Sequence, residues 1–405
     1  MKEPIPAFGA YGIELEYAIV DRDSLDVAPL APMLLERMPA CTRIAAVPVG
    51  WSNELAAHVA ELKNVDPVVS LDRLPDPFQE SVRDANRVLA AGNARLLPGG
   101  MHPWMDPARE TVLWTHSDAG IYRAYDRIFD CRRHGWANVQ SMHVNLPFAD
   151  DAQFARLLDA VRLVLPLVPA IAASSPFVDG RPAAERDHRL AVYATHAKAV
   201  PELLGPLVPE PCCSREAYER DVLSPMYTAI APHDPDGILR HEWLNSRGAI
   251  ARFDRHAIEI RLADTQECPQ ADIAVAHAIC TLVRMLYDEQ LSSARDQRTV
   301  ATPALVALLA DATCRAEAAV ADGAFLRAMG IRTTATCTLR DVWRRVLDRA
   351  QDSDGAWHRA VDVILDQGTL AARILASAGP EPTRKRLKEV YGELAACLEE
   401  GRPFG

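Results

Sequence analysis

The sequence contains no CxxC pair, although it has 9 cysteines among its 405 residues. Structural zinc sites and dithiol redox centres normally depend on such pairs, so we expect neither of them. The cysteines are scattered from Cys41 to Cys397, and the adjacent Cys212 and Cys213 are typical of loop or core positions. Their odd number in a long chain indicates reduced cysteines, and hence a cytoplasmic protein.

Long apolar runs are also absent from the sequence. No run of roughly 18 apolar residues occurs, which is the length that a membrane-spanning helix requires, and the N-terminal segment lacks the apolar core of a signal peptide. The most apolar segment, 157–173, carries Asp159, Arg162 and two prolines. This composition favours a buried helix, and we expect no membrane partner.

Positive charge is scarce in this chain. Lys and Arg number 44 against 55 Asp and Glu, which gives a formal net charge of −11. Such a surface repels phosphates, so we expect no nucleic-acid partner. A local basic pocket for a phosphorylated small molecule is still compatible with this charge. The oligomeric state, including a homo-oligomer, is left open.

Hydrophobic periodicity divides the chain into a strand-rich part and a helical part. Alternation predicts strands over 8–20, 138–147 and 249–263. A helical period predicts helices over 78–95, 119–133, 151–172, 270–292, 302–321, 338–350, 354–377 and 383–400. The Pro-rich segment 174–240 is expected to be irregular, with two short helices near 184–198 and 214–222, and to act as a lid. We predict a single α+β domain over 1–405, strand-rich over 1–265 and helical over 266–405.

Two predicted strands carry charged side chains opposite an apolar face. In segment 11–19, Glu14 and Glu16 share one face. Two carboxylates at this spacing suit a hard divalent cation, although a solvated sheet face shows the same alternation. In segment 256–264, Glu259 and Arg261 share a face with alanines such as Ala263. This pair is compatible with a metal ligand beside a phosphate clamp or with a surface ion pair.

A third strand and an acid pair extend this pattern. His143 and Asn145 share the polar face of segment 141–146, where a lone histidine is more often structural than a ligand. Glu54 and Glu61 lie seven residues apart, which places them on one side of a helix or on opposite sides of a regular strand. Solvated faces typically carry Lys, Thr and Gln. Faces rich in Glu, His and Arg indicate a concave surface that holds metal ions and phosphates.

Six motifs occur in an order that resembles the glutamate–cysteine ligase-like carboxylate–amine ligases, the bacterial second family of that enzyme in the glutamine-synthetase-like superfamily. They are GIELEY (12–17), the pair Glu54 and Glu61, GGMHPWMDP (99–107), SMHVNL (141–146), IEIRLADTQ (258–266) and DQGTLAARIL (366–375). The resemblance spans nearly the whole chain. It implies a single catalytic domain with a curved, mainly antiparallel sheet that forms the active-site face, is backed by helices and precedes a helical C-terminal part.

The resemblance also implies the chemistry. ATP phosphorylates a substrate carboxylate, commonly the γ-carboxylate of glutamate, and an amine then attacks the acyl phosphate to form an amide. His143 and Arg261 would be catalytic and, with Asn145, would contact the nucleotide, while the partners would be small, amino-acid-like substrates. Mg²⁺, or Mn²⁺ in its place, would be held by Glu14, Glu16, Glu54, Glu61 and Glu259.

The sequence departs from the family pattern at the histidine strand. The family often has HVHV where this chain has His143-Val144-Asn145, so the second position cannot titrate and can mark a different substrate. The segment 174–240 is expected to close over the substrate and to supply cations to its carboxylate from Arg181, Arg186, Arg189 and Lys198.

Three alternatives to a ligase are open on the same fold. They are a metal-dependent amide hydrolase, another phosphotransfer enzyme such as a guanidino kinase, and a non-catalytic pseudoenzyme. The run of carboxylates argues against the pseudoenzyme, because buried charges without a ligand are costly.

Overall fold

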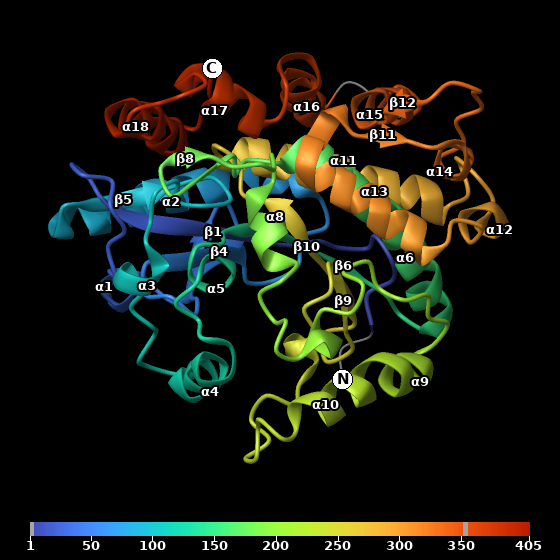
Figure 1. The fold of residues 1–405 in the computed structure, drawn as a ribbon, viewed down its shortest axis with the longest axis horizontal. Helices are drawn as coiled ribbons and strands as arrows, with labels where there is room; N and C mark the ends of the chain where they lie inside the picture. The colour runs from blue at the N-terminus through green and yellow to red at the C-terminus, as the bar shows by residue number, and fades with distance from the viewer. Residues whose placement is uncertain (1–3, 351–354) are drawn as a thin grey trace.

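The computed structural model describes residues 4–350 and 355–405, and a large antiparallel sheet lies at its centre (Figure 1). The order of the strands along its main path is β2 (Thr42–Ile44), β3 (Val47–Asn53), β4 (Val59–Asn64), β1 (Gly12–Asp21), β6 (Ser141–Pro147), β10 (Ala257–Asp264) and β9 (Ala249–Arg252). In addition, β5 (Ala94–Leu97) pairs with the end of β1. All these pairings are antiparallel, which confirms the predicted fold class.

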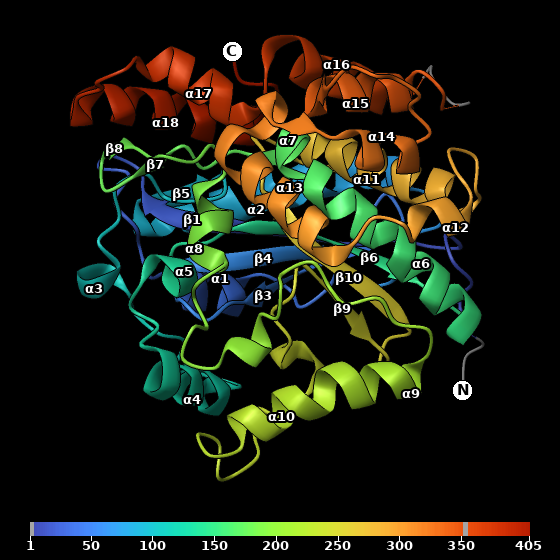
Figure 2. The ribbon, with the colours of Figure 1, turned by 45° about the vertical axis from the view of Figure 1, so that its right-hand side comes forward.

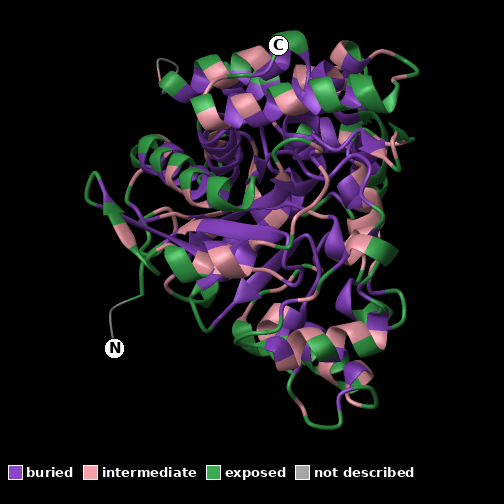
Figure 3. Cartoon of the chain, turned by 90° about the vertical axis from the view of Figure 1, so that its left-hand side faces the viewer, coloured by how far each residue is buried: buried purple, intermediate pink, exposed green. Residues whose placement is uncertain are grey.

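One face of the sheet is apolar and packs against helices. Ile13, Leu15 and Tyr17 of β1 are at most 1% exposed. Burying an aliphatic side chain of this size stabilises the fold by roughly 1.5–3 kcal/mol. The helices that share this core include α2 (Pro75–Leu89), α6 (Asp151–Val164) and α11 (Pro269–Tyr287). Figure 3 shows the sheet as largely buried, with exposed residues concentrated on the outer helices.

The remaining helices form two groups at opposite ends of the molecule (Figure 2). Beside the other face of the sheet and below it lie α3 (Pro107–Glu110), α4 (Ala119–Phe129), α5 (His134–Ala137), α8 (His188–Tyr193), α9 (Arg215–Tyr218) and α10 (Ser224–Ile230). Helix α1 (Ala31–Arg37) packs against α2 and β3. The helices on the side of α11 are α7 (Pro169–Ala172), α12 (Ala294–Gln297), α13 (Thr302–Arg315), α14 (Gly323–Ala328), α15 (Leu339–Leu347), α16 (Ala356–Gln367), α17 (Leu370–Ala378) and α18 (Arg384–Glu400). Two small hairpins are formed by β7 (Phe177–Val178) with β8 (Arg181–Pro182) and by β11 (Val320–Ala321) with β12 (Cys337–Thr338).

Several element boundaries differ from the prediction. Segment 249–263 is a hairpin of β9 and β10, because a turn that includes His256 at φ 52° reverses the chain. The helix predicted over 78–95 ends at Leu89, and β5 follows it. The helix predicted over 354–377, whose first residue lies outside the described residues, is interrupted at Gly368 (φ 100°), after which Thr369 caps α17.

The segment 174–240 is more ordered than the sequence predicted. It contains the β7–β8 hairpin and α8, and α9 continues through a π-helical turn into α10, so the helical path runs to Ile230 and not to 222. All 9 cysteines are free. Among residues 4–350 and 355–405, no helix combines the length and apolar character that crossing a membrane demands.

Candidate active site

The register of the central strands brings the predicted polar residues together. Glu14 of β1 lies opposite His143 of β6, and Glu16 of β1 lies opposite Glu61 of β4. Glu259 lies on β10, the next strand beyond β6. Because directly opposite residues point to the same side of an antiparallel pair, these side chains share one face.

Glu54 reaches this face from a loop. Strand β3 ends at Asn53, so Glu54 begins the connection to β4, which carries Glu61. Glu54 therefore follows the end of β3 and Glu61 lies within β4, so neither the helix nor the single strand considered from the sequence is formed.

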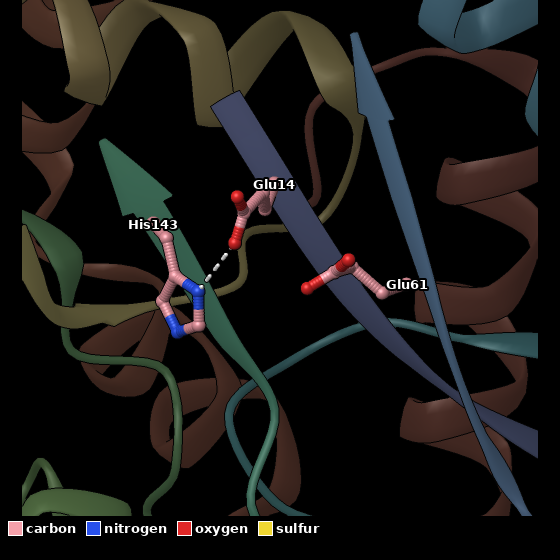
Figure 4. Close-up of side chains that lie close together, drawn as sticks. All are labelled: Glu14, Glu61 and His143. Carbon is pink, nitrogen blue, oxygen red and sulfur yellow. Dashed lines mark hydrogen bonds and ion pairs between the residues drawn. The ribbon is translucent and has the colours of Figure 1, made fainter. Parts of the chain in front are cut away.

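Two groups of ligand atoms have the spacing of a cation site, and they share Glu61. The first contains Glu14, Glu61 and His143 (Figure 4), and the second contains Glu16, Glu54 and Glu61. In each group, one ligand atom from every residue lies within 4.8 Å of the others. Carboxylate oxygens in this arrangement suit a hard divalent cation.

The clustered acids have opposite pKa shifts. Burial, together with the charges of Glu16 and Glu61, raises the pKa of Glu54 well above its usual range. Burial and the charge of Glu14 also raise the pKa of Glu61. Burial alone would raise the pKa of Glu14, but the hydrogen bond and charge of His143 lower it to about 2. The positive charges nearby therefore do not fully offset the negative charge of the second group, Glu16, Glu54 and Glu61.

His143 links the two glutamates of β1. Its Nδ1 lies 3.0 Å from Oε2 of Glu14, and its Nε2 lies 2.9 Å from Oγ of Ser141. The backbone N–H and the hydroxyl of Ser141 donate to Oε2 of Glu16 at 2.6 and 3.0 Å. Burial would lower the pKa of His143, but the surrounding glutamates raise it. A protonated His143 therefore offsets part of the negative charge of the cluster.

Glu259 is held between two guanidinium groups. Arg261 donates to its Oε1 from Nε and Nη2 at 2.9 and 2.7 Å, and Arg252 of β9 donates to its Oε2 from Nη1 at 3.2 Å. Burial would raise the pKa of Glu259, but Arg261 and the other cations nearby lower it. Glu259 is 2% exposed, so the pair with Arg261 is not the surface ion pair that the sequence also allowed.

A β-bulge in β10 lies at Arg261, whose side chain lines the cavity described below. Arg261 and Leu262 both lie opposite the single residue His143, which is the count that defines a bulge. Ala263 consequently pairs with Met142 on the apolar face. Regular alternation had placed Ala263 on the polar face, and that prediction was wrong because it assumed an unbroken period of two.

The polar face forms the floor of a cavity of about 550 Å³. Among the described residues, Asn145 does not line this cavity, and it donates instead to Oε1 of Glu14 at 3.4 Å. The predicted site residues that do line it are Glu14, Glu16, Glu54, Glu61, His143, Glu259 and Arg261.

Three cations of the cavity were not predicted from the sequence. Lys63 lies 2.6 Å from Glu61, Arg255 lies 3.8 Å from Glu14, and Arg252 contacts Glu259. Lys63 could have been found, because it shares a strand face with Glu61. Arg252 ends β9 and Arg255 lies in the turn of the β9–β10 hairpin, where the alternation of the sequence predicts one continuous strand.

The cations predicted from segment 174–240 mostly lie elsewhere. Arg189 lines the cavity but is buried in an ion pair with Asp264. Arg181, Arg186 and Lys198 do not line it, since their elements face other surfaces. Of the four predicted cations, Arg189 alone therefore lines the cavity in this structure.

Several known proteins are similar to this chain in sequence or in fold. An uncharacterized protein of Archaeoglobus fulgidus is 29% identical over 397 residues, which cover 97% of this chain and 99% of the relative. A protein of Bradyrhizobium diazoefficiens that is provisionally named glutamate–cysteine ligase 2 is 27% identical over 282 residues, which cover 69% of this chain and 59% of the relative. The fold is similar to the crystal structure of glutamate–cysteine ligase from Francisella tularensis in complex with AMP, with a TM-score of 0.59, 12% identity, and coverage of 98% of this chain and 90% of that chain.

The family is settled by a match over most of the sequence. The model described as glutamate–cysteine ligase family 2 matches residues 10–393, a span that contains both acidic groups, the bulge and the two arginines on Glu259. The chain belongs to glutamate–cysteine ligase family 2, a family of carboxylate–amine ligases.

Proposed function

We propose that this protein is an ATP- and Mg²⁺-dependent ligase. It activates a carboxylate, such as the γ-carboxylate of glutamate, as an acyl phosphate and joins it to an amine to form an amide. The observation that carries the proposal is the convergence of two acidic groups on Glu61 beside Arg261 in one cavity. ATP and a carboxylate are both anionic, so they approach each other only where cations offset their repulsion. The AMP bound by the Francisella tularensis enzyme supports a nucleotide substrate on this fold.

The residues of the floor fit Mg²⁺. The group of Glu16, Glu54 and Glu61 consists of carboxylates alone, and the raised pKa of Glu54 reflects negative charge that a cation would offset. Bound Mg²⁺ would neutralise phosphate oxygens and stabilise the charge that develops during phosphoryl transfer. Glu259 is not a member of either group of ligand atoms. Its Oε1 is the atom that could be added to the group of Glu14, Glu61 and His143. That oxygen lies 3.9 Å from Nδ1 of His143 and accepts a hydrogen bond from Arg261.

Arg261 has the geometry of a phosphate clamp. Its planar guanidinium group donates two hydrogen bonds to one oxygen of Glu259, and it reaches the cavity through the bulge of β10. In the proposed reaction, Arg261 shifts donors from Glu259 to the transferring phosphoryl group, where a fork of donors matches two phosphate oxygens. His143 stays beside Glu14 and offsets its charge while the substrate carboxylate takes up the phosphate.

The cavity favours direct phosphorylation of the substrate. No cysteine is present among the described residues that line it. Burial raises the pKa of Cys131 and Cys268, so neither supplies a reactive thiolate. The acid is therefore activated as its own acyl phosphate, and the walls of the cavity must exclude water to prevent hydrolysis.

An isotope experiment tests this mechanism. With ¹⁸O in the carboxylate of glutamate, we expect one labelled oxygen in the released phosphate for each amide formed, together with ADP. Release of AMP carrying the label, or loss of the labelled oxygen to water with unlabelled phosphate, would contradict the acyl phosphate. Cleavage of a γ-glutamyl amide without ATP would instead indicate an amide hydrolase.

A further inference from the structure

The charged floor of the cavity faces a wall of aromatic rings. Only 6% of the chain is aromatic, yet rings from α4, α5, α8, the turn that follows α8, and η6 (Glu242–Leu244) line this one cavity. The aromatic wall, as we name it, consists of Tyr122, Tyr125, Trp136, Tyr193, His196 and Trp243.

The rings of the aromatic wall hold one another in place. The centroid of Tyr125 lies 5.0 Å from that of Trp136 and 6.2 Å from that of Trp243, while His196 lies 4.6 Å from both Trp136 and Tyr193. The indole N–H of Trp136 donates to the carbonyl of His196 at 3.0 Å. The wall is therefore a preformed apolar surface that needs little reorganisation to receive a ligand.

The aromatic wall is uncharged. Burial lowers the pKa of His196 to about 4, so its ring is neutral at physiological pH. Among the described lining residues outside the floor, Asp118 at the start of α4 carries the one carboxylate, and it is exposed. A ligand on this side thus meets aromatic faces and one acid at the rim.

The cations of the cavity are already engaged, with one exception. Lys63 is bonded to Glu61, Arg189 to Asp264, and both Arg252 and Arg261 to Glu259. Arg255, in the turn between β9 and β10, is the one described lining cation whose side chain has no hydrogen bond to a carboxylate. Arg255 lies 3.8 Å from Glu14 and 4.0 Å from Asp254. Because these ion pairs are long, its guanidinium group can still pair with one substrate carboxylate, such as the α-carboxylate of a glutamate donor. A second amino acid would bring a further carboxylate into an acidic cavity without a partner.

The geometry points to an acceptor that is a primary amine with an aromatic ring and no carboxylate, its ring packed on the aromatic wall and its amine nitrogen directed to the acyl phosphate at the floor. This inference rests on the proposed ligase function. In the bond-forming step, the deprotonated amine attacks the acyl carbon, the bond between that carbon and the phosphate oxygen breaks, and phosphate leaves with the bonding pair. The ammonium proton passes to solvent before the attack, and the second proton that the nitrogen loses passes to the leaving phosphate. The overall products are ADP, phosphate and an N-arylalkyl amide.

Matched pairs of acceptors test the inference. With glutamate, ATP and Mg²⁺, we expect 2-phenylethylamine to give at least tenfold higher kcat/KM for ADP formation than phenylalanine, and cysteamine to exceed cysteine. Equal or reversed preferences would overturn the inference and leave the ligase function intact. Absence of ADP formation with every pair would count against the ligase function with glutamate. In that case, quenching of tryptophan fluorescence in the presence of ADP and Mg²⁺ still decides the inference, since 2-phenylethylamine must bind more tightly than phenylalanine.

Substitution of the aromatic wall gives a second test. Trp243→Leu should raise the KM for 2-phenylethylamine about tenfold and leave the KM for ATP within twofold, whereas Trp243→Phe should retain most of the affinity. Trp357, which lies on α16 outside the cavity, provides the matched control in Trp357→Leu. A rise in the KM for ATP alone would assign the wall to the nucleotide base and overturn the inference.

Discussion

The Nη1 atom of Arg252 lies 3.2 Å from Oε2 of Glu259, the oxygen that Arg261 leaves free. Arg252 is itself fixed by Asp254, which accepts hydrogen bonds from its Nε and Nη2 at 3.1 and 3.0 Å. Each oxygen of Glu259 therefore has its own arginine. This arrangement makes Arg252 a positioning residue that acts through Glu259 and keeps Oε1 directed toward His143 and Arg261.

We expect Arg252→Gln to lower kcat about 10- to 100-fold, the range typical of residues that orient a metal ligand or its neighbour. The KM for ATP should change less, and Arg252→Lys should restore only part of the rate because lysine cannot bridge two carboxylates as a planar fork does. Steady-state kinetics check this prediction.

The control for Arg252 is another buried arginine. Arg247 is 4% exposed and pairs with Glu210 through Nε and Nη2, but it does not line the cavity. Arg247→Gln should destabilise the fold without a selective effect on kcat. Equal losses of kcat in both variants, after correction for folded protein, would contradict a positioning role for Arg252.

Arg261→Lys tests the phosphate clamp. The substitution keeps the positive charge but loses the two parallel donors that now hold Glu259. We expect kcat to fall on the order of 100-fold with little change in the thermal midpoint, because such donors act mainly on charge that develops in the transition state. A wild-type kcat would show that Arg261 serves only its ion pair with Glu259.

The sequence predicted β1 and β6, two of the strands that carry the site, because their side chains alternate strictly. Glu14, Glu16 and His143 follow from a period of two, and the antiparallel pairing of β1 with β6 then brings them together. Strands β2 to β5 were not predicted. Strand β3 contains Pro48 and Gly50 and is buried over most of its length, so it shows no polar and apolar alternation.

The rest of the site depends on tertiary geometry that periodicity does not encode. The bulge at Arg261 and Leu262 adds a residue to β10, which reverses the side expected for Ala263. The contact of Arg252 with Glu259 requires a hairpin turn between them. The aromatic wall comes from segments between 119 and 244 that have no common spacing and meet only in the folded chain.

The segment 174–240 supplies part of the aromatic wall through Tyr193 and His196, so ligands should protect it. We expect amide hydrogen exchange over 188–200 to slow when ATP, Mg²⁺ and glutamate are added together, because closure excludes water from the acyl phosphate. Helices α15 to α18 lie on the far side of the sheet and serve as the internal control (Figure 1). Unchanged exchange throughout 174–240 would rule out a lid.

Glu61 is shared by both groups of ligand atoms, so its loss should affect both. We expect Glu61→Gln to remove nearly all ATP turnover and to raise the Mg²⁺ concentration needed for half-maximal activity at least 10-fold. Asn145→Ala should have a smaller effect, since Asn145 contacts Glu14 but not the cavity. Titration of activity with Mg²⁺ and with a chelator provides the measurement. Full activity in excess chelator would contradict a divalent cation in this site.

The pH dependence of stability reports the charge of the second acidic group. Burial, with the charges of Glu16 and Glu61, raises the pKa of Glu54 in the folded protein, whereas an unfolded glutamate titrates near ~4.3. Between these values the folded chain binds more protons than the unfolded chain, so the free energy of unfolding falls as pH rises. Each unit of such a shift corresponds to about 1.4 kcal/mol. Glu54→Gln removes this contribution.

We therefore expect the Glu54→Gln variant to become more stable than the wild type as pH rises from 5 to 8 in a metal-free buffer. Saturating Mg²⁺ should reverse the order, because the cation stabilises the ionised Glu54 and binds the folded state alone. Thermal midpoints of both proteins, measured at each pH with and without Mg²⁺, check the two parts. If the metal-free midpoints of wild type and variant run parallel with pH, the pKa of Glu54 is not raised in the folded protein. The group of Glu16, Glu54 and Glu61 would then no longer be supported as a cation site.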